Sequence, residues 1–203
     1  PYNADGVGVF DAATSAFSLV DISGTIATDY KFRGASTAGN GLVIFAPSDA
    51  NLVGVFDATT LAFSGVDISG TISTTDKFNG AAAAPNGLVI FAPSNADIVG
   101  LFDATTLTFS DVDISNTLLT NPKFQGASTA LNGLVIFAPD SSDVVAAFDA
   151  TNKVFSFLDI SSVSVPTMSG FAAVASNGFV VFPPKNSGSV GVFWYKWSPA
   201  DFT

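Results

Sequence analysis

The sequence lacks histidine, cysteine and glutamate, and each absence removes a class of function. Without histidine and cysteine, the chain has neither the usual general base of enzymes nor a thiol nucleophile. The absence of cysteine also excludes a disulfide framework and thiolate metal ligands. We therefore expect a protein that is not an enzyme and that has no cofactor, no catalytic residue and no metal site.

Good helix formers are also scarce. The chain has one methionine, six lysines, one arginine and a single glutamine, Gln125. Val, Ile, Phe and Thr, which favour strands, are abundant instead. The apolar residues occur in runs of four or five, cut by Gly, Asn, Asp, Ser and Thr. This pattern predicts an all-β chain, and no apolar run is long enough to span a membrane.

The charge balance bears on partners and location. A net charge of −10 argues against nucleic acid, because phosphate must be neutralised by clustered Lys and Arg. The same charge suits an extracellular or cell-surface protein. The sequence has no N-x-Ser/Thr sequon, whereas its many Ser and Thr residues offer positions for O-linked glycans. The chain begins with Pro1 rather than Met, which indicates a processed protein or a fragment of a longer one.

One octapeptide recurs along the chain. NGLVIFAP fills residues 40–47, 86–93 and 132–139, and NGFVVFPP fills residues 177–184. The motif Phe-Asp-Ala recurs every 46 residues in the same rhythm. We therefore interpret residues 1–203 as a single repeat domain. It has full units at about 31–76, 77–122 and 123–166, and partial units at 1–30 and 167–203.

The unit that starts at Lys77 reads as four strands. KFNGAAAA is a first strand of small residues, and the following Asn-Gly supplies the positive φ angles of a tight turn. LVIFAP is a second strand, apolar on both faces and ended by Pro93. IVGLFDATT is a third strand, and LTFSDVDIS is a fourth that alternates apolar and polar residues. Four antiparallel strands in about 46 residues describe one blade of a β-propeller, in preference to a β-solenoid coil or an immunoglobulin-like sandwich.

The blade interpretation makes specific predictions of burial. We expect residues 42–46, 88–92, 134–138 and 179–182 to be buried inner strands. The small residues of the first strand suit a crowded central axis.

The unit resembles the Kelch-like and related propeller repeats of secreted and protist proteins, of the type F-x-G-A-x-x-A-x-N-G-x-V-x-F-x-P followed by V-x-x-F-D. Here the copies read FRGASTAGNGLVIFAP…VGVFD, FNGAAAAPNGLVIFAP…VGLFD and FQGASTALNGLVIFAP…VAAFD. The fourth copy, MSGFAAVASNGFVVFPP…VGVFW, lacks the Lys-Phe start and the Asp. The resemblance covers almost the whole chain, and it implies blade architecture while saying little about activity.

The phase of the repeat suggests how the chain ends. It opens with a third and a fourth strand, at about 6–11 and 16–22, and it closes with a first, second and third strand. Both ends therefore carry a third strand, and only one of them can complete a closed last blade. The chain is either a closed ring of four blades or an open array completed by a neighbouring copy, and an open head-to-tail contact builds a filament.

Repeated aspartates are the first candidates for a site. Asp11, Asp57, Asp103 and Asp149 lie in Phe-Asp-Ala, and Asp21, Asp67, Asp113 and Asp159 lie in Asp-Ile-Ser. They could ring a ligand or metal, or bind calcium, but we favour turn residues that accept hydrogen bonds from nearby backbone amides. A catalytic site is normally made once, by residues that break the repeat.

The C-terminus breaks the repeat most clearly. FWYKWSP at 193–199 holds both tryptophans, which either cap the last blade or form an interface. We predict that residues 188–203 pack against strands 6–22 of a neighbouring copy. The predicted interface residues are Phe193, Trp194, Tyr195, Trp197, Val7, Val9 and Phe10. Two functions follow: a non-catalytic extracellular protein that assembles head to tail into a filament or surface layer, or a closed small propeller that binds a glycan or a protein.

Overall fold

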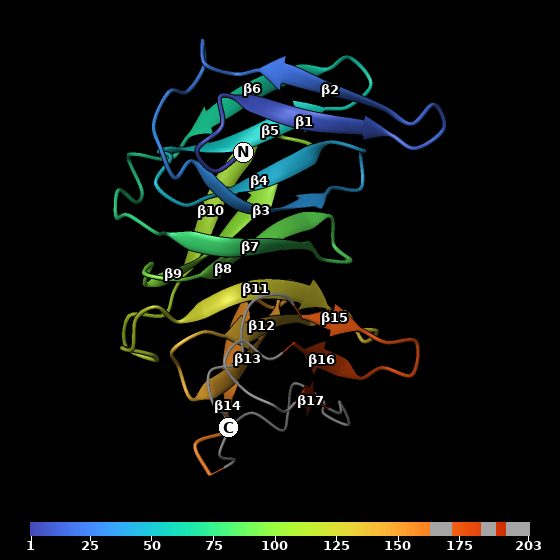
Figure 1. The fold of residues 1–203 in the computed structure, drawn as a ribbon. Helices are drawn as coiled ribbons and strands as arrows, with labels where there is room; N and C mark the ends of the chain where they lie inside the picture. Colours follow the sequence, from blue (N-terminus) through green and yellow to red (C-terminus); the bar gives the residue numbers. More distant parts are fainter. Residues whose placement is uncertain (163–171, 184–189, 194–203) are drawn as a thin grey trace.

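A computed structural model describes residues 1–162, 172–183 and 190–193 of the chain. This part of the chain forms seventeen strands in five antiparallel sheets and contains no helix. The sheets follow one another in chain order from the N-terminal hairpin at one end to the C-terminal sheet at the other (Figure 1). The all-β prediction is confirmed. In the described residues there is no helix long and apolar enough to cross a membrane.

Three sheets are complete blades, each with four strands in sequential order. Blade 1 consists of β3 (Phe32–Thr37), β4 (Val43–Pro47), β5 (Leu52–Asp57) and β6 (Ala62–Asp67). Blade 2 consists of β7 (Phe78–Ala83), β8 (Leu88–Pro93), β9 (Ile98–Asp103) and β10 (Thr108–Asp113). Blade 3 consists of β11 (Phe124–Thr129), β12 (Val135–Pro139), β13 (Val144–Asp149) and β14 (Val154–Asp159).

Two incomplete blades flank the complete ones. The N-terminal hairpin is β1 (Gly6–Asp11) and β2 (Ala16–Asp21), which correspond to the third and fourth strands of a blade. The C-terminal sheet is β15 (Ala173–Val174), β16 (Val180–Phe182) and β17 (Gly191–Phe193), which correspond to the first three strands. The predicted order of strands is confirmed at both ends.

The first strands of the blades lie side by side along the axis, as β3, β7 and β11 in Figure 1 show. Their backbones approach so closely that only glycine fits. A Cβ at Gly34 would lie 2.8 Å from the Cα of Gly80, and a Cβ at Gly80 would lie 2.8 Å from the Cα of Gly126. Real Cβ atoms essentially never come this close. Glycine is therefore required at these two positions, which agrees with the crowded axis predicted from the small residues of the first strand.

Apolar side chains fill the spaces between blades. We call the side of a blade that meets the next blade along the chain its forward face, and the opposite side its backward face. At the joint of blades 1 and 2, Ile44 and Val53 of the forward face pack against Phe91 and Phe102 of the backward face. All four side chains are fully buried. The joint of blade 3 with the C-terminal sheet uses the same positions, and the joint of the hairpin with blade 1 uses the third-strand ones, with Val7 at the position of Val53 and Phe56 at that of Phe102.

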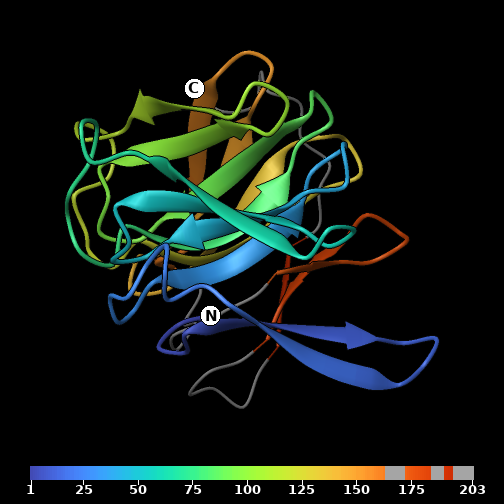
Figure 2. The ribbon, with the colours of Figure 1, turned by 90° about the horizontal axis from the view of Figure 1, so that it is seen from above.

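The second strands are buried as predicted in blades 2 and 3, except for Leu88 at the start of β8, and only in part at the two ends of the array, where Phe179 and Val181 of the C-terminal unit are half-buried. Residues 89–92 and 135–138 are buried throughout, whereas Val43 and Phe45 of β4 are half-buried. These two side chains belong to the backward face of blade 1, which the N-terminal hairpin covers only in part. In Figure 2 the hairpin lies along the lower edge of the molecule and its tip extends past the complete blades.

Candidate functional site

The aspartates of Phe-Asp-Ala close the turns between the third and fourth strands. In blade 1, Asp57 accepts hydrogen bonds from the backbone N–H of Thr59 at 2.8 Å and from the hydroxyl of Thr60 at 2.8 Å. These bonds favour the carboxylate, so they hold the pKa of Asp57 below its ordinary value. The equivalent aspartates accept backbone bonds in the same way. The interpretation as turn residues is confirmed.

The aspartates of Asp-Ile-Ser have a similar local role. Asp67 accepts a hydrogen bond of 2.8 Å from the backbone N–H of Ser69, and its pKa is lowered by this bond and by the Ser69 hydroxyl. The three equivalent aspartates make the same bond with the serine two residues on. In the part of the chain that the structure describes, no three His, Cys, Asp or Glu residues gather at a spacing that could hold a metal ion.

A buried lysine directly precedes the first strand of each complete blade, and two of these lysines form ion pairs with the preceding sheet. Lys31 donates to Asp5 of the N-terminal hairpin at 3.1 Å, and Lys123 of blade 3 donates to Asp97 of blade 2 at 2.8 Å. Both lysine side chains are fully buried, while the carboxylates are more than half exposed. Each ion pair therefore joins one blade to the loop of the blade before it.

Lys77 is the exception among these lysines. It is equally buried, but the position that corresponds to Asp5 and Asp97 is occupied by Asn51. Its ammonium donates to the carbonyl of Thr74 at 2.7 Å. Burial lowers the pKa of Lys77, and the nearby charge of Asp49 opposes this shift. The joint of blades 1 and 2 thus lacks the ion pair of the other two joints.

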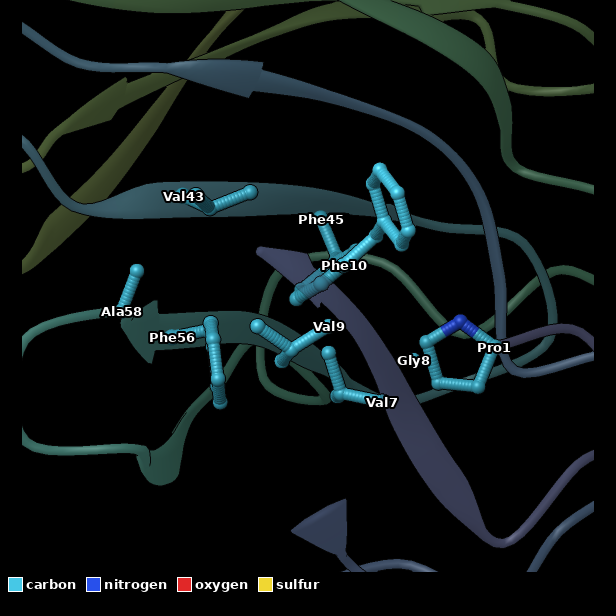
Figure 3. A pocket seen from close by; sticks show the side chains of 9 residues that line it. All are labelled: Pro1, Val7, Gly8, Val9, Phe10, Val43, Phe45, Phe56 and Ala58. Atoms are coloured by element: carbon cyan, nitrogen blue, oxygen red, sulfur yellow. The ribbon is translucent and has the colours of Figure 1, made fainter. Parts of the chain in front are cut away.

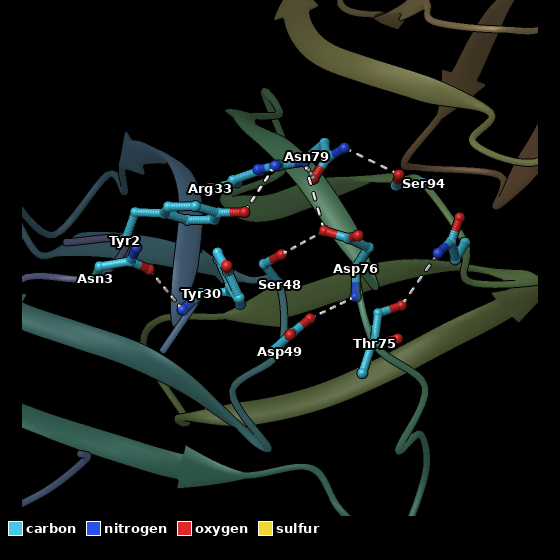
Figure 4. A network of polar contacts seen from close by, with 11 residues as sticks. Tyr2, Asn3, Tyr30, Arg33, Ser48, Asp49, Thr75, Asp76, Asn79 and Ser94 are labelled. Carbon is cyan, nitrogen blue, oxygen red and sulfur yellow. Dashed lines mark hydrogen bonds and ion pairs between the residues drawn. The ribbon is translucent and has the colours of Figure 1, made fainter. Parts of the chain in front are cut away.

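A polar cluster surrounds Arg33, the single arginine of the chain (Figure 4). Its guanidinium donates to the Tyr2 hydroxyl at 2.8 Å and to Asn79 of blade 2 at 3.3 Å, and it lies 3.5 Å from a carboxylate oxygen of Asp76. The guanidinium carbon Cζ also lies over the Tyr2 ring, 4.9 Å from the ring centroid, and the Tyr2 ring contacts the ring of Tyr30. Arg33 and Tyr30 both replace smaller or uncharged residues of the other units, so this cluster breaks the repeat.

The N-terminal hairpin leaves its backward face exposed. Phe10 is 64% exposed, Phe17 is 70% exposed and Leu19 is 65% exposed. Phe56 and Phe102 occupy the position of Phe10 in complete blades, and both are buried against the preceding sheet. The difference arises because no described sheet precedes the hairpin.

The C-terminal sheet leaves its forward face exposed. Val190 is 57% exposed and Val192 is 60% exposed. The equivalent residues of blade 2, Val99 and Leu101, are buried in the joint with blade 3. One end of the array therefore presents an open backward face, and the other end presents an open forward face.

The interface residues predicted from sequence lie in three different environments. Phe10 belongs to the exposed backward face. Val7 is buried and Val9 half-buried, because both point toward blade 1. Phe193 is half-buried against blade 3. The remaining predicted residues, Trp194, Tyr195 and Trp197, lie outside the described residues, and the predicted contact of the two ends with a neighbouring copy stays a prediction.

Comparison with known proteins identifies the fold as a β-propeller type. No family model, of Kelch repeats or of any other type, matches the sequence. No curated protein matches it either. Many solved structures do match, and their likeness concerns the fold alone because the sequence identities are low.

Three of these structures illustrate the match. A virginiamycin B lyase from Staphylococcus aureus has a TM-score of 0.72 and 8% identity, with 96% of this chain and 64% of that chain covered. A streptogramin B lyase has a TM-score of 0.69 and 13% identity, with 97% and 63% covered. The extracellular domain of a putative one-component system from B. thetaiotaomicron has a TM-score of 0.67 and 8% identity, with 94% and 25% covered. The chain thus spans less than two thirds of the two lyases, and the proteins that share its fold include enzymes and extracellular domains.

Sequence reasoning missed two features of the candidate surfaces. The first is the Arg33 cluster, which joins residues of three units. The sequence feature that could have revealed it is the break in the repeat at Arg33 and Tyr30. The exposed valines of the C-terminal sheet were missed because they keep the repeat pattern. Their exposure follows from their place in the last described sheet rather than from their identity.

Proposed function

We propose that this protein is a non-catalytic, extracellular structural protein whose copies assemble head to tail through the open faces of their terminal sheets. One observation carries the proposal. The exposed backward face of the N-terminal hairpin and the exposed forward face of the C-terminal sheet are the two kinds of surface that pack together at every internal joint. A second copy placed as the next blade would bring these surfaces together.

The internal joints supply the template for this contact. Valines and isoleucines of a forward face meet phenylalanines of a backward face at the joint of blades 1 and 2. In the proposed joint, Val190 and Val192 of one copy meet Phe10 and Phe17 of the next. Because the two faces differ, the contact is head to tail, and it extends into a linear array unless the array closes on itself.

The area of the exposed faces suggests a reversible joint. The exposed side chains at the two ends present roughly 500 Å² of apolar surface; they are Phe10, Phe17, Leu19, Val190 and Val192. Burying this surface would stabilise the joint by roughly 12 kcal/mol at about 25 cal/mol per Å². Association costs about 4–15 kcal/mol in lost freedom of motion. At the low end of that cost about 8 kcal/mol remains, which corresponds to micromolar affinity, so we expect assembly at micromolar concentration or above rather than a permanent polymer. The charge of −10 per copy opposes association, so added salt should promote it.

The absence of histidine supports a role without catalysis. A histidine-to-alanine variant of a virginiamycin B lyase with this fold is described as catalytically inactive. This chain has no histidine, so the chemistry that depends on that residue has no counterpart here. The repeated aspartates, which are the abundant titratable groups, are engaged in turns. Extracellular placement is supported by the extracellular domains among the proteins of similar fold.

Sedimentation velocity over a range of concentrations tests the proposed function. We expect the sedimentation coefficient to rise with protein concentration and with salt, and electron microscopy of the concentrated protein to show linear particles. Single chains at every concentration and salt would refute assembly. A measured turnover of any substrate would refute the non-catalytic part separately.

A second candidate function, binding of a glycan, is favoured by the Arg33 cluster. An exposed tyrosine ring, a guanidinium and a carboxylate within one patch are groups that bind sugar rings and hydroxyls. Titration with neutral and uronic-acid oligosaccharides tests this candidate. The matched control is Arg33→Gln, since Gln125 holds the equivalent position in blade 3. Binding that Arg33→Gln abolishes supports the candidate, whereas equal binding by both proteins refutes it.

A further inference from the structure

Among the described strands, β1 has a neighbour on one side only, whereas the third strand of each complete blade has one on both sides. In each complete blade, the third strand lies between the second and the fourth. In blade 1, β5 pairs with β4 in the register Val43 to Phe56 and Phe45 to Gly54. Among the described strands, β1 pairs with β2 alone. The long edge of β1 that faces away from β2 therefore has no partner strand in the part of the chain that the structure describes.

The pairing of β1 and β2 shows which backbone groups lie on the open edge. The N–H of Ile22 donates to the carbonyl of Asp5 at 2.8 Å. Antiparallel pairs alternate between hydrogen-bonded and non-hydrogen-bonded positions. Val7 and Val9 therefore bond to β2, and the backbone groups of Gly8 and Phe10 point to the open edge. These are the residues that correspond to Gly54 and Phe56, the partners of β4.

An apolar hollow of about 340 Å³ lies beside the same edge (Figure 3). Val7 and Val9 of β1 line one side of it, and Val43, Phe45 and Phe56 of blade 1 line the other. The hollow lies between the forward side of the hairpin and the backward face of blade 1. No charged side chain lines it.

The next joint of the array shows what fills the corresponding space. Between blades 1 and 2, Ile44 and Ala46 of β4 are fully buried against Val89 and Phe91. Both side chains come from a second strand, whereas the described N-terminal hairpin consists of β1 and β2, which correspond to a third and a fourth strand. By this comparison, the hollow has the place that an isoleucine and an alanine, two positions apart on a strand paired with β1, would fill. Pro1, which also lines the hollow, holds the repeat position of Pro47.

We propose that the open edge of β1 and this hollow form a strand-acceptor site. The ligand is an extended, uncharged peptide segment with the pattern of the second strand, Leu-Val-Ile-Phe-Ala. Its backbone pairs with Gly8 and Phe10, and its Ile and Ala side chains enter the hollow. Strand addition of this kind takes affinity from main-chain hydrogen bonds and specificity from pockets for alternate side chains. The site lies on an edge of the hairpin and does not depend on the proposed contact between faces.

The ligand is a segment that is not already part of a blade. The second strands of the described chain, β4, β8, β12 and β16, each pair with a strand on both sides. Within its described residues, a folded second copy therefore has no such strand to donate without opening one of its own sheets. The structure favours a separate extended segment of this sequence pattern as the occupant.

Fluorescence anisotropy with a labelled peptide tests the proposal. The probe is Lys-Lys-Asn-Gly-Leu-Val-Ile-Phe-Ala-amide, in which the lysines keep the peptide soluble, titrated with the full chain at low concentration. We expect saturable binding. A peptide with Asp in place of Ile should bind at least tenfold more weakly, because it would place a charge in the hollow.

Two N-methylated peptides form the matched control. N-methylation of the Phe nitrogen removes the donor that faces Gly8, so it should weaken binding at least tenfold. N-methylation of the Ile nitrogen alters a group on the far side of the peptide, so it should change binding less than twofold. Equal effects of the two methyl groups would overturn the proposal, as would the absence of binding.

Because these changes are in the peptide, misfolding of a variant cannot explain the result. The variant Val192→Asp, altered at the opposite end of the array, should bind the peptide as well as the unaltered chain does. Loss of binding in that variant would assign the peptide to the C-terminal face and overturn the proposal, while leaving the proposed assembly open to its own test.

Discussion

The same repeat position is open at the N-terminus and buried in blade 2, which provides an internal comparison of stability. Phe102 is 0% exposed in the joint with blade 1, and Phe10 is 64% exposed on the N-terminal hairpin. A buried phenylalanine removes about 200 Å² of surface from water, or about 5 kcal/mol at about 25 cal/mol per Å². With about a third of its surface covered, Phe10 keeps about 2 kcal/mol by the same measure.

We expect Phe102→Ala to lower the free energy of unfolding by about 3–5 kcal/mol, in line with large-to-small changes in protein cores. Phe10→Ala should lower it by about 1–2 kcal/mol. Urea denaturation followed by circular dichroism, at a concentration where copies are separate, measures both changes.

Raising the protein concentration should increase the cost of Phe10→Ala and leave that of Phe102→Ala unchanged. The reason is that the proposed joint buries Phe10 and leaves Phe102 where it is. Equal costs for the two variants in dilute solution would show that the backward face of the hairpin is covered, and the account of the open end would then be wrong.

Three further predictions concern the axis, the buried lysines and the turns. Gly80→Ala should destabilise the fold by about 1–3 kcal/mol by thermal melting, because its Cβ would clash with backbone, whereas Gly24→Ala, which meets nothing within 4 Å, should be nearly neutral; equal melting temperatures would contradict the axis contact. Asn51→Asp should stabilise the fold by about 1 kcal/mol at low salt, because it would give Lys77 an ion pair like those of Lys31 and Lys123. A loss of stability would refute the proposed role of these ion pairs. The turn aspartates have pKa values lowered by folding, so their contribution is present above the unfolded pKa of about 4 and is lost as pH falls through the folded values; stability that is flat between pH 5 and pH 2 would contradict it.

Much of the fold could be predicted from the repeat. The spacing of Asn-Gly pairs and apolar runs indicated the order of strands within a unit and the incomplete units at both ends. The turn role of the aspartates was also predictable, because an Asp accepts bonds from amides two or three residues away. These features depend on short-range chemistry, which the order of residues records directly.

Contacts between units were harder to predict. The bond of Arg33 to Asn79 joins equivalent positions of neighbouring blades, and only the rotation between blades brings them together. Whether the array closes depends on the same rotation, and the close approach of Gly34, Gly80 and Gly126 at the axis is likewise a contact between units. No local pattern reports that angle, so the choice between a closed ring and an open array could not be made from sequence.

The most direct test of the central claim mixes two variants that each lack one face. Phe10→Asp places a charge on the backward face of the hairpin, and Val192→Asp places one on the forward face of the C-terminal sheet. Leu119→Asp, at a position 83% exposed in the loop that joins blades 2 and 3, is the matched control and should assemble as the unaltered chain does. Sedimentation velocity of each face variant alone should show single chains, and an equal mixture should form a dimer and nothing larger, because one intact face of each kind remains. Larger assemblies from either face variant alone, or single chains only in the mixture when the unaltered protein assembles, would contradict head-to-tail assembly through these faces.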